Sequence, residues 1–216
     1  MKKILFAASE SVPFIKTGGL ADVVGSLPKW FDKKEYDVRV IIPKYMCIDE
    51  KWKSKMQYVD HFYMDLCWRR QYVGILQMEL DGVTYYFIDN EYYFSGPKPY
   101  GDVRYDLEKF AFFSRAVLSA LPVIGFRPDI IHCHDWHTGL IPVYLKDSFA
   151  YSEFYQGIKS IMTIHNLKFQ GVWDINTIKD IAGLSDYYFT SDKLKDYDNG
   201  NYLKGGIVYA DWVTTV

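Results

Sequence analysis

The sequence predicts an α/β domain built on a doubly wound, mostly parallel β-sheet with a β-hairpin excursion. Short, almost wholly apolar runs are typical of strands that are buried on both faces. They span residues 4–8, 38–42, 130–135 and 159–166. Segments with apolar residues at helical spacing separate these runs, and regular alternation of strand and helix is typical of a parallel sheet covered by helices.

Composition supports one packed domain and excludes several classes of protein. The chain has 216 residues, 49% of them hydrophobic, and a formal charge of -2, so it has a core but no basic excess for nucleic acid. Cys47, Cys67 and Cys133 lack the even count and close spacing of a disulfide framework, which favours a reducing compartment. No apolar run has the length of a signal-peptide core or a membrane span. We expect a cytoplasmic protein that binds neither nucleic acid nor a membrane.

The first strand, at residues 4–8, leads through the loop Lys16-Thr17-Gly18-Gly19 into a helix at residues 20–31. Such a turn directs free backbone N–H groups and the positive end of the helix dipole toward a ligand, and glycine lets that ligand approach closely. Lys16 adds a cation of the kind that a departing diphosphate needs. The loop therefore predicts an anion site, with a simple tight turn and a solvated lysine as the alternatives.

Two standard nucleotide motifs do not fit this loop. A P-loop has its lysine after the glycines, whereas Lys16 precedes them. The dinucleotide fingerprint needs a third glycine and an acidic residue after the second strand, but the strand at residues 38–42 ends in Pro43-Lys44. A nicotinamide-dependent enzyme is therefore disfavoured.

The middle of the chain predicts an antiparallel excursion beside the main sheet. Residues 58–66, 72–80 and 83–89 are β-rich, and Asp81-Gly82 between the last two is a hairpin signal. The pattern leaves open whether part of this excursion continues the main sheet. Residues 91–101, rich in Tyr, Pro and Gly, are expected to form a loop.

The remaining elements alternate between helix and strand. A helix at residues 106–124 is apolar nearly all round and is expected to be largely buried. Further helices are expected at residues 136–147, 174–183 and 201–210, and a last strand at residues 212–216. Residues 184–200 show no clear pattern.

Unusual polar residues follow three of the strands, at the carboxyl ends where parallel sheets bind ligands. They are Lys16–Gly19, His134–His137 and His165–Asn166. Asp135 either caps the next helix or belongs to a site, whereas His165 and Asn166 have no packing reason to be polar, which favours a functional role. His132 shares a strand face with His134 and is expected to be buried and hydrogen-bonded. The spacing of His132, His134, Asp135 and His137 matches no usual zinc pattern, so no metal is expected.

With these motifs in place, the chain resembles bacterial glycogen synthase of the ADP-glucose-dependent, starch synthase type. The resemblance rests on Lys16–Asp22, His132–His137, Thr163–Leu167 and Asn201–Lys204. It implies that residues 1–216 form the Rossmann-like N-terminal, acceptor-side domain of a two-domain GT-B glycosyltransferase, without its C-terminal nucleotide-binding domain. It also implies retaining transfer of glucose from ADP-glucose to the 4-hydroxyl at the non-reducing end of an α-1,4-glucan such as glycogen. No cofactor is implied, and the fragment alone is expected to be inactive.

The resemblance assigns roles to individual residues. His165 would lie against the transferred glucose, and Asp135 would contact the sugar or order the site, without acting as a nucleophile. Lys16, Gly18 and Gly19 would meet the donor phosphates and the neighbouring acceptor region. The other substrate-binding positions are Asp22, Tyr100, Trp136, His137, Asn166, Asn201 and Lys204. The alternative function is a non-catalytic glucan-binding module, which the 18% aromatic content also suits.

Overall fold

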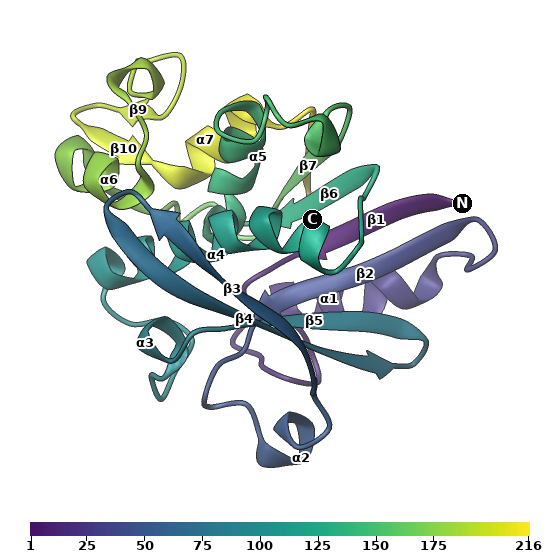
Figure 1. The fold of residues 1–216 in the computed structure, drawn as a ribbon. Helices are drawn as coiled ribbons and strands as arrows, with labels where there is room; N and C mark the ends of the chain where they lie inside the picture. The colour runs from purple at the N-terminus through teal and green to yellow at the C-terminus, as the bar shows by residue number, and fades with distance from the viewer.

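The computed structural model describes residues 1–216 and has one large eight-stranded sheet (Figure 1). The strands lie in the order β11 (Trp212–Thr215), β7 (Lys159–Ile164), β6 (Ile130–His134), β1 (Lys2–Ala7), β2 (Tyr36–Pro43), β5 (Val83–Asp89), β4 (Arg69–Leu80) and β3 (Gln57–Leu66). All pairs from β11 to β5 are parallel, and β5, β4 and β3 pair antiparallel. The predicted fold class is confirmed.

The excursion in the middle of the chain belongs entirely to the main sheet. β5 pairs parallel with β2 on one side and antiparallel with β4 on the other, and β3 forms the edge. The alternative left open by the sequence, that the excursion continues the main sheet, therefore holds for all three strands. The predicted hairpin turn is confirmed, since Asp81 and Gly82 both have positive φ, of 53° and 71°, as a two-residue turn with this twist requires.

The helices differ from prediction mainly at their ends. The expected helix at residues 20–31 is divided into α1 (Gly19–Ser26) and a 3₁₀ turn at Leu27–Trp30, where Pro28 cannot donate a helical hydrogen bond. Helix α4 (Val103–Val123) begins before residue 106, because the Asp102 side chain accepts hydrogen bonds from two amides of the first turn. The remaining helices are α2 (Glu50–Lys53), α5 (Leu140–Lys146), α6 (Ile175–Ala182) and α7 (Tyr202–Tyr209).

Two segments without a clear sequence pattern contain regular structure. The expected loop at residues 91–101 begins with the single turn α3 (Glu91–Phe94), which is capped by the side chain of Asn90. A small antiparallel sheet joins β8 (Val172–Asp174), β10 (Asn199–Asn201) and β9 (Lys195–Asp196). These strands have only two or three residues each, which is too short for a periodic pattern to reveal them.

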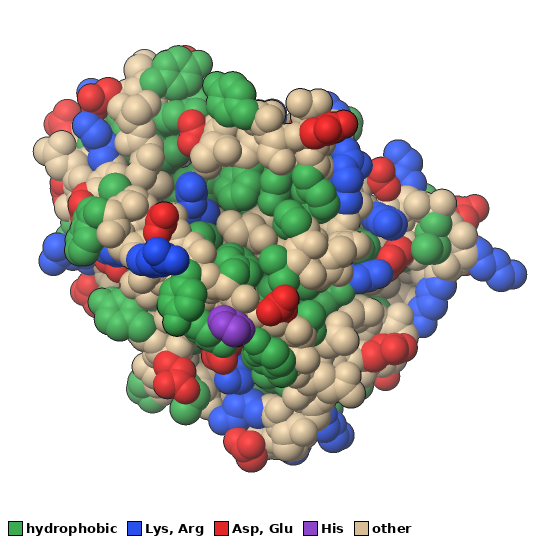
Figure 2. Space-filling model, in the orientation of Figure 1, with side chains coloured by type: hydrophobic (Ala, Val, Ile, Leu, Met, Phe, Trp, Pro, Cys, Tyr) green, Lys and Arg blue, Asp and Glu red, His purple; other side chains and the backbone are tan.

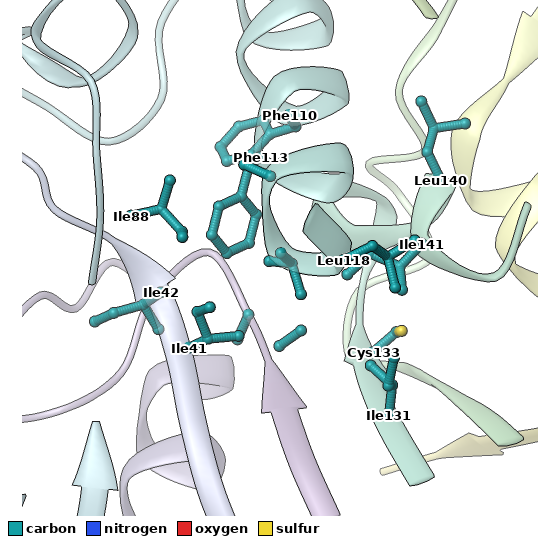
Figure 3. Close-up of a cluster of buried hydrophobic side chains, with 14 of the residues drawn as sticks. Ile41, Ile42, Ile88, Phe110, Phe113, Leu118, Ile131, Cys133, Leu140 and Ile141 are labelled. Carbon is teal, nitrogen blue, oxygen red and sulfur yellow. The ribbon is translucent and has the colours of Figure 1, made fainter. Parts of the chain in front are cut away.

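Helix α4 occupies the centre of the core, as its apolar sequence predicts. Figure 3 shows Phe110, Phe113 and Leu118 on α4 facing side chains of the strands and of α5. All three are fully buried, as are the labelled strand residues Ile41, Ile42, Ile88, Ile131 and Cys133. None of the helices combines the length and the apolar character that crossing a membrane would require.

The turn between β6 and α5 is packed against α7 without intervening side chains. A Cβ atom at Gly139 would lie 2.3 Å from the carbonyl oxygen of Tyr202. A Cβ atom at Gly206 would lie 3.0 Å from the Gly139 Cα. The first distance is too short for any side chain, and the second would force the neighbouring backbone to move by a few tenths of an ångström, so the backbone of this turn is held directly on α7.

The surface that carries the β3–β4 hairpin has no extended patch of one charge. Figure 2 shows Lys and Arg side chains interspersed with Asp and Glu side chains over this face, with hydrophobic groups between them. Exposed aromatic residues on the hairpin include Tyr58, Tyr63 and Trp68. The even mixture agrees with the formal charge of -2 and gives no basic surface for nucleic acid on this face.

Candidate active site at the carboxyl ends of the strands

A cavity of about 630 Å³ opens where the order of the strands reverses. The chain passes from β1 to β2 on one side and later places β6 on the other side of β1, so loops leave the carboxyl ends of β1 and β6 in opposite directions. Most of the predicted site residues line this cavity. They are Gly18, Gly19, Tyr100, Asp135, Trp136, His137, His165 and Asn166.

Asp135 stands immediately after β6 in an unusual backbone conformation. Its φ of 56° and ψ of -179° lie in a region that is essentially reserved for glycine, at a cost of about 1–3 kcal/mol for another residue. Its Oδ1 accepts hydrogen bonds from the backbone N–H groups of His165, at 2.8 Å, and Asn166, at 3.3 Å. It makes no capping bond to the following turn, so the capping interpretation is wrong.

The Asp135 carboxylate links the turn after β6 to the end of β7. Asp135 is 6% exposed, and burial raises the pKa of its carboxyl group, while the two N–H donors and His165 act in the opposite direction. Its Oδ2 makes no hydrogen bond within the chain. Unlike the unpartnered ring nitrogens His134 Nε2 and His137 Nδ1, this oxygen is not enclosed by protein atoms. That oxygen is therefore open to the cavity.

Three histidines are connected at the same ends of β6 and β7. His134 is fully buried, and its Nδ1 lies 2.9 Å from the Nε2 of His165. His132 is stacked on His134 with a ring-centroid distance of 4.3 Å, which confirms that the two share a strand face. The Nε2 of His132 lies 2.6 Å from Thr163 Oγ1, so the expected hydrogen bond is confirmed, although the residue is only partly buried. Burial lowers the pKa of His165, although Asp135 opposes the shift.

Aromatic rings form the wall of the cavity between α4 and the turn after β6. Tyr100 is stacked on His137 at 4.7 Å, and its hydroxyl lies 2.7 Å from Ser9 Oγ. Burial lowers the pKa of His137 to about 3, so this imidazole is neutral at physiological pH. Trp136 packs on the backbone of Gly171, which has a φ of 65°. A Cβ atom at Gly171 would lie only 2.4 Å from the indole ring, so no side chain fits there.

The glycines of the loop after β1 lie at the N-terminus of α1. Gly18 has a φ of -151°, which any residue can adopt, and a Cβ on it would have only Glu10 Oε1 nearby, at 3.9 Å. A Cβ on Gly19 would meet nothing within 4 Å. Neither backbone conformation nor packing requires glycine at these positions, and both residues line the cavity. The first N–H groups of α1 also lack partners within the helix.

Comparison with known proteins identifies the family. Residues 3–216 match the family described as the starch synthase catalytic domain. The chain belongs to this family. A protein named glycogen synthase from Lachnospira eligens is 71% identical over 216 residues, and another of that name from Lachnoclostridium phytofermentans is 67% identical. The resemblance drawn from the motifs is confirmed.

A solved starch synthase structure confirms the fold. The catalytic domain of starch synthase IV from Arabidopsis thaliana, which was bound to ADP and acarbose, matches the whole chain with a TM-score of 0.85 at 29% identity. The chain covers 44% of that structure and 45% of the length of each bacterial glycogen synthase. It therefore spans less than half of these relatives.

Four positions that the resemblance to the starch synthase family assigns to the site lie outside the cavity wall. Lys16 Nζ pairs with Asp22 at 2.8 Å on the surface, with both side chains about half exposed. Asn201 caps α7 by accepting a hydrogen bond from the Lys204 N–H at 2.9 Å. The Lys204 ammonium donates to the carbonyl of Ser191 at 2.7 Å. In this structure these four side chains bond to the chain itself.

Glu10 is a cavity residue that the sequence analysis missed. It is 3% exposed, and its Oε2 accepts a hydrogen bond from the Thr17 N–H at 2.5 Å. Burial raises the pKa of its carboxyl group, and nearby Asp135 raises it further. The available signal was the polar run Ser9-Glu10-Ser11 directly after an apolar strand, which is the same signal that identified Asp135. No three His, Cys, Asp or Glu side chains are grouped so that they could hold a metal ion.

Proposed function

We propose that this chain forms the acceptor-side half of the active site of an ADP-glucose-dependent glucosyltransferase. The reaction is retaining transfer of glucose to the 4-hydroxyl at the non-reducing end of an α-1,4-glucan. The observation that carries the proposal is the cavity at the reversal of strand order, where Asp135 and His165 lie on one wall and Gly18 and Gly19 on another. Membership of the starch synthase family supports the same substrate class.

The donor diphosphate would bind at the N-terminus of α1. The empty space beside Gly18 and Gly19 allows a phosphate to reach the unpartnered N–H groups of the first turn, where the helix dipole favours negative charge. The Thr17 N–H is bonded to Glu10 and the Gly18 N–H also acts on that carboxylate, so the donors are the first amides of α1 itself. Lys16 can join them, because an exposed ion pair such as Lys16–Asp22 contributes only about 0–1 kcal/mol and gives way to a phosphate at little cost.

The transferred glucose would lie between the loop after β1 and the turn after β6. Asp135 Oδ2 is free to accept a hydrogen bond from a sugar hydroxyl, while Oδ1 is fixed by two backbone N–H groups. The His165 ring reaches the same space. A carboxylate held in a prepared position stabilises developing positive charge without reorganising, and the loss of one such group costs about 10²–10³ in rate. Asp135 is assigned this ordering and electrostatic role, not that of a nucleophile.

The rest of the donor site is proposed to come from sequence that the bacterial relatives have in addition to this part. The chain covers 45% of their length. Half of a donor site positions the donor poorly, and correct positioning supplies a large share of the rate enhancement in group transfer. We therefore expect the 216-residue chain alone to be inactive.

The test is a chimera in which this chain replaces the matching 216 residues of the Lachnospira eligens protein. We expect it to incorporate labelled glucose from ADP-glucose into glycogen, and we expect the isolated chain to give only background. Asp135→Asn and His165→Ala should each lower incorporation by about 10²–10³. Asp186→Asn is the control, because it makes the same Asp-to-Asn change at an exposed residue in the 3₁₀ turn that follows α6.

Three outcomes would contradict parts of the proposal. Strong incorporation by the isolated chain would show that no further sequence is needed. Near-wild-type rates for folded Asp135→Asn and His165→Ala chimeras would remove both residues from the site. If the isolated chain bound glycogen tightly and the chimera were inactive while the parent enzyme was active, the glucan-binding module would be favoured instead.

A further inference from the structure

His134 has a hydrogen-bonding problem that the site described so far does not explain. Its ring is completely buried, stacked on Phe6 at 5.4 Å and on His132 at 4.3 Å. Its Nδ1 has one partner, His165 Nε2, at 2.9 Å, and its Nε2 has none. His134 does not line the cavity, whereas His165 does, so His134 meets the site only through the second ring.

The two rings can share their hydrogen bond in two ways while both are neutral. If His165 Nε2 carries the proton, His134 must accept it at Nδ1 and carry its own proton on Nε2, which leaves a buried N–H group with no acceptor. If His134 Nδ1 carries the proton and donates to His165, the buried Nε2 is an unprotonated acceptor. Among backbone groups, buried N–H donors without a partner are rarer than acceptors with unused lone pairs, and the same preference favours the second arrangement here.

The surroundings of His165 favour the same arrangement. With its Nε2 accepting from His134, the proton of His165 lies on Nδ1. This nitrogen has no hydrogen-bond partner in the chain and is not enclosed by protein atoms. Because His165 lines the cavity, the nitrogen is open to it. It is also the ring nitrogen nearer the backbone, where the Asp135 carboxylate accepts the His165 N–H at 2.8 Å, and this negative charge favours a proton on that side.

We propose that His134 is a positioning residue that fixes the tautomer of His165, so that His165 presents an Nδ1–H donor to the ligand in the cavity. This inference rests on the proposed function only for the identity of that ligand. His165 then acts toward a sugar oxygen as a hydrogen-bond donor with a fixed direction, and it cannot act as a base from Nδ1. His134 acts through His165 and does not touch the substrate.

The direct test is the protonation pattern of the imidazole nitrogens, which requires no activity. A long-range ¹H–¹⁵N correlation spectrum of the ¹⁵N-labelled 216-residue chain distinguishes protonated from unprotonated ring nitrogens. The chain has only five histidines, and His165→Gln assigns the signals of His165. We expect protonated Nδ1 and unprotonated Nε2 on His165, and protonated Nδ1 on His134. A proton on Nε2 of His165 would overturn the proposal.

Variants of His134 provide the second arm. His134→Phe keeps the stacking but removes the donor, so we expect His165 to become a mixture of both tautomers. His134→Asn places an amide N–H near the former Nδ1 and should restore the single Nδ1–H form. His132→Phe changes the ring stacked on His134 without touching His165 and should leave the tautomer unchanged. A pure Nδ1–H form in a folded His134→Phe chain would show that His134 does not set it.

The same variants in the chimera connect the tautomer to turnover. His134→Phe should lower kcat about tenfold, the effect of losing roughly 1.4 kcal/mol of transition-state stabilisation, with little change in KM for glycogen. His134→Asn should recover most of that loss. If the chimera is inactive for other reasons, the NMR result still decides the tautomer, so failure of the proposed function and failure of this inference are distinguishable.

Discussion

Glycines occur in the loop after β1 and against the turn after β6, but they have opposite surroundings. At Gly19, in the loop after β1, a Cβ would meet nothing within 4 Å, whereas at Gly171, under the turn after β6, it would lie 2.4 Å from the Trp136 ring. Packing would therefore allow a side chain at Gly19, whereas it excludes one at Gly171. At Gly19 the backbone is open to a ligand that lies in the cavity, whereas at Gly171 the space is already filled by the chain's own Trp136.

Low pH should destabilise the end of β6 and the turn after it most strongly, through their histidines. Burial lowers the pKa of His137 to about 3 and that of His132 to about 4, below the ordinary value of 6.5. Because the folded-state pKa values are depressed, the neutral rings contribute stability above pH 6.5, and this contribution is lost as pH falls toward 4 and 3. Between pH 6.5 and pH 5 the loss of unfolding free energy should be about 1.6 kcal/mol for each ring, or about 3 kcal/mol for the two together.

Urea unfolding as a function of pH measures this loss, and His137→Phe isolates one ring. The difference in unfolding free energy between the wild type and His137→Phe should narrow by about 1.6 kcal/mol from pH 6.5 to pH 5. Glu10 and Asp135 act with the opposite sign, because burial raises their pKa values, so their protonation in acid partly offsets the loss. A pH-independent gap would mean that His137 is not buried as a neutral ring.

Gly171→Ala should lower stability by about 3 kcal/mol. The new methyl group collides with the Trp136 ring, and alanine is also disfavoured at a φ of 65°. The melting temperature should fall by roughly 6–12 °C. Gly157→Ala is the matched control, since its φ of 82° imposes the same backbone penalty while the nearest side-chain atom lies 4.0 Å away. Equal losses for the two variants would show that the contact with Trp136 is unimportant.

Gly19→Ala should leave stability unchanged or raise it by up to about 1 kcal/mol, since alanine favours helices. In the chimera it should nevertheless raise KM for ADP-glucose about tenfold, because the methyl group enters the space proposed for the phosphates. Thermal unfolding and initial rates at varied ADP-glucose test the two halves separately. An unchanged KM would remove the loop glycines from the donor site and leave them without an explanation.

Lys16→Ala should change the unfolding free energy by less than about 1 kcal/mol, because its ion pair with Asp22 is half exposed. Asp22→Asn is the companion variant that breaks the same pair from the other side. If Lys16 binds the donor phosphates, only Lys16→Ala should also weaken ADP-glucose binding. Equal weakening by both variants would mean that the ion pair matters as a structural unit.

Much of the fold was predictable because its strongest patterns are long or fully apolar. Buried parallel strands such as β1 and β2, and the apolar helix α4, have patterns that few other structures share. Chain topology then places the carboxyl ends of β1, β6 and β7 side by side. The grouping of His165 with Asp135 and Gly19 around one cavity follows from this order alone.

The features that escaped prediction depend on contacts between distant residues. Nothing near Asp135 in the sequence indicates that its carboxylate turns to the amides of residues 165 and 166 in place of capping the next turn. The hydrogen bond between His134 and His165 spans 31 positions and depends on the register of two strands. Lys16 and Lys204 show the reverse case, in which a motif is plain but the side chain bonds to its own chain.

The contact between the turn after β6 and α7 also restricts how the sequence can change over evolutionary time. A crowded core position can usually be enlarged if a neighbour is made smaller. Gly139 and Gly206 face each other with no side chain on either, and the next neighbours are a carbonyl oxygen and Met162. No compensating substitution exists within this pair, so both positions should stay fixed while the surrounding sequence drifts, and any redesign of the turn has to begin by leaving them untouched.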